Sequence, residues 1–131
     1  MFIDASVLSA MMTDEEEARA FAIRMQPATA RMTSPLAAAN AAILVSAALG
    51  LSPTGAGEAV RTFLQLMNIQ MFAVPPRAAV LATEAYERFG QNDHPARLSL
   101  DDCMTYACAR YYRQPLLSKS DRFGHTDIDM A

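Results

Sequence analysis

Short runs with strand character alternate with longer helix-like segments along this chain. The runs lie at residues 1–3, 31–33, 70–74 and 115–118. Strands that are separated by helices pair in parallel, because each helix carries the chain back to the same end of the sheet. We therefore expect an α/β fold in which helices flank a small, mostly parallel β-sheet.

The helical segments have recognisable ends. The pattern predicts helices over residues 5–12, 15–25, 35–49, from 53 through 67, 78–89 and 100–111. Thr13 or Asp14 is expected to cap the second, whose first turn is rich in acidic residues that the helix dipole favours. Ser34 followed by proline is a typical helix start, and Gly50 is a typical stop.

Length and composition limit the class of protein. The 131 residues suffice for one domain, spanning 1–131. A hydrophobic fraction of 52% with 19% charged residues excludes a disordered chain. The formal net charge of −3 argues against broad, non-specific nucleic-acid binding, for which a strongly basic face is expected.

Cys103 and Cys108 are the only two cysteines, and they lie five residues apart in a predicted helix. Their side chains would point in different directions, so we expect neither a disulfide nor a thiolate metal pair. Two reduced thiols suit a cytoplasmic location. The N-terminal residues lack the basic start of a signal peptide, and the apolar run 36–51 is too short for a bilayer, so we expect no membrane association.

Three acidic residues stand at predicted element boundaries. Asp4 follows the first strand, Asp102 lies at a helix start, and Asp121 follows the last strand. Ligands bind at the carboxyl ends of parallel strands, and carboxylates gathered there are typical of a Mg²⁺ or Mn²⁺ site. The alternative is structural: Ser99 and Asp102 have the spacing of a capping box, and Asp121 could cap a turn.

Asn40 is the one amide in an otherwise apolar helical stretch. A buried amide without partners costs roughly 1–3 kcal/mol, so Asn40 either bonds to backbone in the core or faces a polar cleft. Ser6 either orients the Asp4 site or merely begins the helix. Neither His94 nor His125 is placed with a nucleophile in a recognisable catalytic arrangement.

Several stretches together carry a family resemblance. They are Met-Phe-Ile-Asp-Ala-Ser at the start, Thr-Ser-Pro-Leu-Ala from 33, His-Pro-Ala from 94, Leu-Asp-Asp-Cys-Met-Thr-Tyr-Ala from 100, Pro-Leu-Leu-Ser-Lys-Ser-Asp-Arg-Phe from 115 and Thr-Asp-Ile from 126. In this order and spacing the chain resembles PIN-domain ribonuclease toxins of the VapC type, from bacterial toxin–antitoxin pairs. The resemblance extends from the first residue to the last.

The resemblance implies a PIN-like fold and a catalytic site that binds Mg²⁺ or Mn²⁺. By position, Asp4, Asp102 and Asp121 would be the metal ligands, with Asp127 as a further candidate and Ser6 as a hydroxyl neighbour. Asp101 occupies a position that is often glycine. At Asn40 the family normally carries glutamate, so the site here lacks one charge and the metal binding is expected to be weakened.

The resemblance also implies partners. These are an RNA substrate, a VapB-type antitoxin, a second copy of the chain in a homodimer, and DNA only indirectly through the antitoxin. Basic side chains near the cleft would position the RNA backbone, the candidates being Arg110, Arg113, Lys119 and Arg122.

Three function classes follow. The first is a metal-dependent endoribonuclease toxin that hydrolyses RNA phosphodiesters. The second is a PIN-fold protein that is catalytically impaired by Asn40 and acts by binding its antitoxin. The third is a phosphoryl-accepting receiver domain, which the sequence disfavours because residues 31–68 are mostly helical and place no acid at the end of a central strand.

Overall fold

The sheet is made of four parallel strands, each only two residues long. The computed structural model describes residues 1–131, and its strands are β1 (Phe2–Ile3), β2 (Met32–Thr33), β3 (Gln70–Met71) and β4 (Leu116–Leu117). Their order across the sheet is β3-β2-β1-β4, and all three pairings are parallel. The predicted α/β fold with a small parallel sheet is confirmed.

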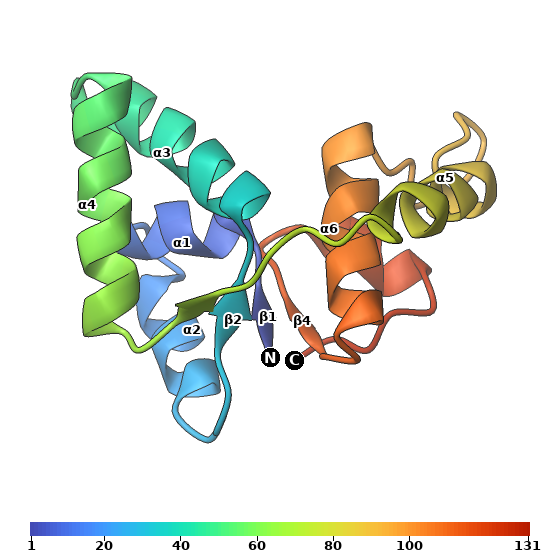
Figure 1. Ribbon diagram of the computed structural model, residues 1–131, viewed down its shortest axis with the longest axis horizontal. Helices are drawn as coiled ribbons and strands as arrows, with labels where there is room; N and C mark the ends of the chain where they lie inside the picture. The colour runs from blue at the N-terminus through green and yellow to red at the C-terminus, as the bar shows by residue number, and fades with distance from the viewer.

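Six α-helices and one short 3₁₀ helix surround the sheet (Figure 1). They are α1 (Ala5–Met12), α2 (Ala18–Met25), α3 (Pro35–Leu49), α4 (Pro53–Leu66), α5 (Ala78–Phe89), α6 (Leu100–Tyr111) and η1 (Asp121–His125). Figure 1 shows α1 to α4 gathered on one side of the sheet, and α5 and α6 on the other. The molecule therefore has three layers, with the sheet in the middle.

Alternation along the strands divides the core in two. Phe2 and Leu116 face a hydrophobic cluster formed with α5 and α6, whereas Ile3 and Leu117 face a cluster formed with α1 to α4. All four side chains are fully buried. Successive residues of a strand point to opposite faces, so two residues per strand are enough to anchor a core on each side.

Local capping sets the helix ends that the sequence predicted. The Ser34 hydroxyl accepts the Ala37 N–H at the start of α3, and Gly50 ends the helix with a left-handed φ of 68°. Helices commonly end on such a residue, and glycine adopts this conformation without steric penalty. The predicted bounds of α1, α3 and α5 are confirmed at both ends.

The start of α2 was predicted wrongly. The helix begins at Ala18, and the three glutamates expected in its first turn precede it, with Glu17 as its N-cap. Asp14 has a positive φ of 54°, which breaks the chain away from the helical path. Lys119 Nζ lies 2.8 Å from Glu15 and 3.9 Å from Glu17, so two of these acids pair with a residue distant in sequence.

Two further expectations concern the cysteines and the apolar helices. Cys103 and Cys108 are both free and buried, so the expectation of no disulfide is confirmed. No single helix is long and apolar enough to cross a membrane; α3 and α4 pass that test only as a pair, and they are bent by 116°. Helix η1 is not among the predicted elements, the last of which ends at residue 118.

Candidate functional site

A cleft opens where the carboxyl ends of the central strands meet. From β1 the chain continues to β2 on one side, whereas β4 lies on the other, so the topology reverses at β1. Ligands of open α/β sheets bind at such a reversal. The cleft is lined by Asp4 and Ser6 after β1, by Asn40 of α3, and by Asp101 and Asp102 of α6. Four predicted site residues, namely Asp4, Ser6, Asn40 and Asp102, are thus brought together.

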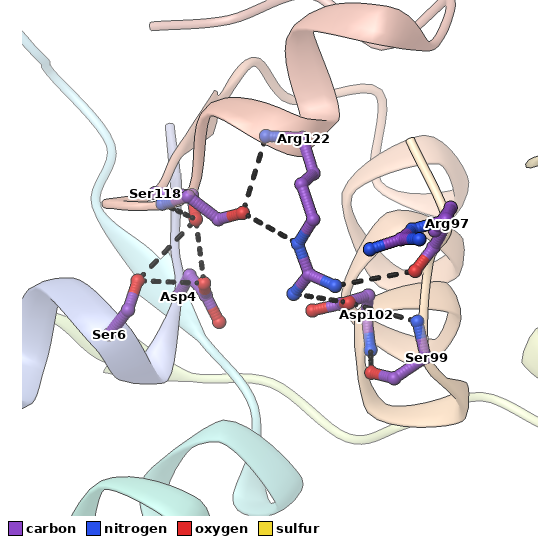
Figure 2. A network of polar contacts seen from close by, with 8 residues as sticks. Asp4, Ser6, Arg97, Ser99, Asp102, Ser118 and Arg122 are labelled. Carbon is purple, nitrogen blue, oxygen red and sulfur yellow. Dashed lines mark hydrogen bonds and ion pairs between the residues drawn. The ribbon is translucent and has the colours of Figure 1, made fainter. Parts of the chain in front are cut away.

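Asp4 is fixed by a set of short hydrogen bonds. It is the N-cap of α1, and its Oδ1 accepts the Ala5 N–H at 2.7 Å. Its Oδ2 accepts hydrogen bonds from the hydroxyls of Ser6 at 2.9 Å and Ser118 at 2.8 Å (Figure 2). Ser6 Oγ in turn accepts the Lys119 N–H at 3.0 Å. The carboxylate is therefore held in one orientation by groups from both α1 and the end of β4.

The electrostatic environment of Asp4 makes its ionised form less favourable than in water. Burial raises the pKa of the Asp4 carboxyl, and the hydrogen bonds from Ser118, Ser6 and Ala5 only partly offset this. The charge of Asp102 raises the pKa further. Two carboxylates close enough to repel each other are stabilised by a positive charge in the same cleft.

Asp102 has both of the roles that the sequence left open. With Ser99 it forms a complete capping box: Ser99 Oγ accepts the Asp102 N–H at 3.1 Å, and Asp102 Oδ2 accepts the Ser99 N–H at 2.9 Å. The same carboxylate lines the cleft. It also forms an ion pair with Arg122, whose Nη2 lies 2.8 Å from Oδ2.

Asn40 faces the cleft rather than the core. Its side chain is half-buried, lines the same opening as Asp4 and Asp102, and forms no hydrogen bond with another residue. The alternative of a core amide bonded to backbone is therefore wrong. The exposed apolar side chains of Ile43 and Leu44, one turn further along α3, line the cleft beside it.

Asp121 and Asp127 lie outside this cleft. Asp121 is exposed at the start of η1, where the chain turns away from β4. Asp127 accepts a hydrogen bond from Tyr106 Oη at 2.6 Å and pairs with Arg88 at 3.2 Å and Arg110 at 3.8 Å. Neither of these two predicted ligands is among the residues that line the cleft with Asp4.

The charges around Asp127 have a structural consequence. Burial raises the pKa of its carboxyl, but the Tyr106 hydrogen bond and the positive charges of Arg88 and Arg110 outweigh this, and the net pKa is lowered. Burial, reinforced by the bond to Asp127, raises the pKa of Tyr106 to about 12. Asp127 therefore serves as an ionised anchor that ties the C-terminal segment to α5 and α6.

The four basic residues expected near the cleft are divided by the structure. Arg122 contacts Asp102, and the Lys119 backbone contacts Ser6. Arg110 and Arg113 instead line a separate pocket with Gln114 and Asp129, at the opposite end of α6. Their predicted placement beside the acidic cleft is wrong, because α6 carries them away from its N-terminal turn.

Sequence reasoning missed Ser118 and the pairing of Arg122 with Asp102. Ser118 is buried and donates directly to Asp4. The sequence does carry a signal for Ser118. It is the first polar residue after the last apolar strand, and side chains at that point reach the carboxyl edge of the sheet. The Arg122–Asp102 pair had no local signal, because the two residues belong to different elements.

The donor set fits a hard divalent cation with few protein ligands. No group of three or more His, Cys, Asp or Glu side chains lies close enough to hold a metal ion. Mg²⁺ commonly takes one or two carboxylates and keeps several waters. Asp4 and Asp102 are two such carboxylates, Oδ1 of Asp102 accepts no hydrogen bond, and Asn40 and Ser6 add neutral oxygens.

Comparison with known proteins identifies the family. The PIN domain family matches residues 1–129. VapC ribonuclease Mb0640 of Mycobacterium bovis is 33% identical over 128 residues, which cover 98% of this chain and 95% of that protein. Ribonuclease VapC28 of Mycobacterium tuberculosis is 35% identical over 135 positions, which cover 100% of this chain and 97% of that protein.

A solved structure supports the same fold. Mycobacterium tuberculosis VapC20, a sarcin-ricin loop cleaving toxin, superposes with a TM-score of 0.76 at 16% identity, covering 99% of this chain and 97% of that one. The comparisons cover nearly the whole of each chain, so the correspondence extends across the domain. The chain belongs to the PIN domain family and, within it, to the VapC ribonucleases.

Proposed function

We propose that this protein is a divalent-metal-dependent endoribonuclease that acts as the toxin of a type II toxin–antitoxin pair. The observation that carries the proposal is the convergence of Asp4 and Asp102 in one cleft at the carboxyl edge of the sheet. Membership of the VapC ribonucleases supports RNA as the substrate. The cofactor is proposed to be Mg²⁺ or Mn²⁺.

Asp4 and Asp102 would hold the ion. When bound, a divalent cation supplies positive charge that polarises an RNA phosphodiester and favours loss of a proton from an attacking water. Ser6 and Ser118 keep Asp4 oriented by donating to its Oδ2. Asp121 and Asp127, which lie outside the cleft, are not needed in this assignment.

Asn40 limits what the cleft does chemically. Its amide oxygen is a neutral donor to a cation, and it cannot accept a proton as a general base. Relative to a carboxylate, we estimate a loss of about 1–3 kcal/mol in metal binding, because most of the Coulomb attraction is offset by desolvation. The proposed enzyme therefore binds its cofactor more weakly than an enzyme with a carboxylate at this position.

The proposed partners follow from the family and from the surface beside the cleft. A VapB-type antitoxin would cover the cleft, where Ile43 and Leu44 are 59% and 48% exposed and offer apolar contact. We further propose that the protein acts in the cytoplasm as a homodimer, and that it meets DNA only through the antitoxin.

Cleavage of RNA by the purified protein tests the proposal. With Mn²⁺ and a structured RNA we expect endonucleolytic products that disappear on addition of EDTA. Asp4→Asn should abolish cleavage while keeping the N-cap of α1, because asparagine caps helices well. Asp93→Asn, at an exposed loop carboxylate outside the cleft, is the matched control and should cleave normally. Equal cleavage by Asp4→Asn and the wild type would contradict the site.

One observation favours a second candidate function. The cleft presents Asn40 in place of a carboxylate, and Arg122 already neutralises Asp102. A catalytically impaired protein that acts by binding its antitoxin is consistent with such a site. Wild-type protein that binds a VapB-type antitoxin but fails to cleave RNA with either metal would support this function over the first.

A further inference from the structure

Arg122 is directed at the acidic cleft by three contacts from its guanidinium. Nε donates to Ser120 Oγ at 3.2 Å, Nη1 donates to the Arg97 carbonyl at 3.3 Å, and Nη2 lies 2.8 Å from Asp102 Oδ2. Figure 2 shows the Arg122 side chain reaching from η1 to Asp102, with Asp4 on the other side of Arg122 in this view. The shortest of the three contacts is the one to the carboxylate.

Lys119, the neighbouring basic residue, pairs with other acidic residues. Lys119 Nζ pairs with Glu15 at 2.8 Å and with Glu17 at 3.9 Å, on the side of α2. No other side chain forms a salt bridge with Asp102, and Asp4 forms none. The positive charge that touches this pair of carboxylates in the structure therefore comes from Arg122, through Asp102.

The position of the charge matters as well as its sign. Asp102 is 16% exposed, so its carboxylate is largely withdrawn from water and interacts strongly with whatever cation touches it. A guanidinium and a divalent ion are both attracted to this carboxylate, and they repel each other. Occupation of Asp102 by one therefore weakens its occupation by the other.

We infer that Arg122 is the built-in counter-cation of the acidic cleft, and that a divalent ion binding at Asp102 displaces the guanidinium from that carboxylate. The inference rests on the proposed function in taking Asp102 as a ligand of the ion. Ser120 and the Arg97 carbonyl are neutral acceptors that remain available after displacement. The charge of Arg122 therefore stays at the rim of the cleft after the ion binds.

Calorimetric titration of Mn²⁺ into metal-free protein tests the inference. Removing the guanidinium in Arg122→Gln should tighten Mn²⁺ binding by roughly five- to tenfold, because a partly buried ion pair no longer competes. Arg122→Lys keeps the charge but cannot make all three contacts, and should lie between Arg122→Gln and the wild type. Lys119→Gln, the matched control, removes a nearby charge that does not touch Asp102 and should change affinity by less than about twofold in salt.

A second background makes the test specific to the contact. In Asp102→Asn protein, adding Arg122→Gln should give no further gain in Mn²⁺ affinity. The inference is overturned if Arg122→Gln binds no tighter than Lys119→Gln, if it binds more weakly than the wild type, or if none of the proteins binds Mn²⁺. Binding in the expected order without any RNA cleavage would instead contradict the proposed ribonuclease function and leave the displacement supported.

Discussion

Oδ2 of Asp102 accepts the Ser99 N–H at 2.9 Å and lies 2.8 Å from Nη2 of Arg122. One oxygen thus completes the cap of α6 and anchors η1. The other oxygen, Oδ1, accepts no hydrogen bond, and the carboxylate lines the same cleft as Asp4. In the sequence, capping was an alternative to a role in the site; in the structure, the capping contact orients the same carboxylate that lines the cleft.

Restoring a carboxylate in the cleft should increase both metal binding and activity. In Asn40→Glu we expect Mn²⁺ affinity to rise about tenfold, within the ~1–3 kcal/mol attributed above to the missing charge. RNA cleavage at subsaturating Mn²⁺ should rise with it. Gln65→Glu, which adds the same charge on an exposed position of α4, is the control. No gain over that control would show that the amide at position 40 is not what limits the site.

Asp4→Asn should stabilise the metal-free protein even though it removes the proposed activity. The pKa of Asp4 is raised in the folded state, so the ionised carboxylate opposes folding at neutral pH. The sign follows from the pKa: the favourable contribution is complete below the unfolded value of about 3.9 and is lost as pH rises through the folded value. Urea unfolding in EDTA should therefore give Asp4→Asn a larger free energy of unfolding than the wild type at pH 8. The difference between the two proteins should be smaller at pH 4. A stability difference that grows as the pH falls would contradict the raised pKa of Asp4.

Tyr106→Phe should destabilise the fold by about 1 kcal/mol at pH 7, through loss of a hydrogen bond to the ionised Asp127. Because the pKa of Asp127 is lowered, its contribution is present above the unfolded value near 3.9 and is lost as pH falls through the folded value. The difference from the wild type, measured by urea unfolding, should thus shrink below about pH 4. The control is Tyr86→Phe, at a tyrosine that is 48% exposed, which should be near neutral.

Two glycine-to-alanine substitutions should change the stability of the fold in opposite directions. Gly50→Ala places a side chain at a φ of 68° and should cost about 1 kcal/mol, although nothing lies within 4 Å of the added methyl. Gly57→Ala lies inside α4, also with nothing within 4 Å, and should stabilise by about 0.5–1 kcal/mol through helix propensity. Thermal unfolding of the two variants measures both effects, and the same sign for both would contradict the backbone explanation.

Local chemistry explains which parts of the fold could be predicted. The ends of α3 follow from Ser34 and Gly50, whose capping interactions lie within a few residues of each other. The late start of α2 could not be foreseen, because its glutamates pair with Lys119 more than a hundred residues away. Local patterns carry no information about such a contact.

Some residues of the site could likewise be placed from the sequence, and others could not. Asp4, Ser6 and Asn40 follow β1 or lie early in the helix after β2, so the parallel topology alone brings them to one edge. Asp121 also follows a strand, but η1 redirects the chain within a few residues and leaves this carboxyl exposed. A short 3₁₀ helix has little sequence signal, so its effect on Asp121 required the structure.

The two walls of the cleft belong to different packing units. Asn40 lies on α3, which packs on α1 and α4, whereas Asp102 lies on α6, which packs on α5. The parallel strands join the two units at the base of the cleft. A ligand that contacts both walls therefore links the two packing units, and its occupancy should slow hydrogen exchange in β1 and β4.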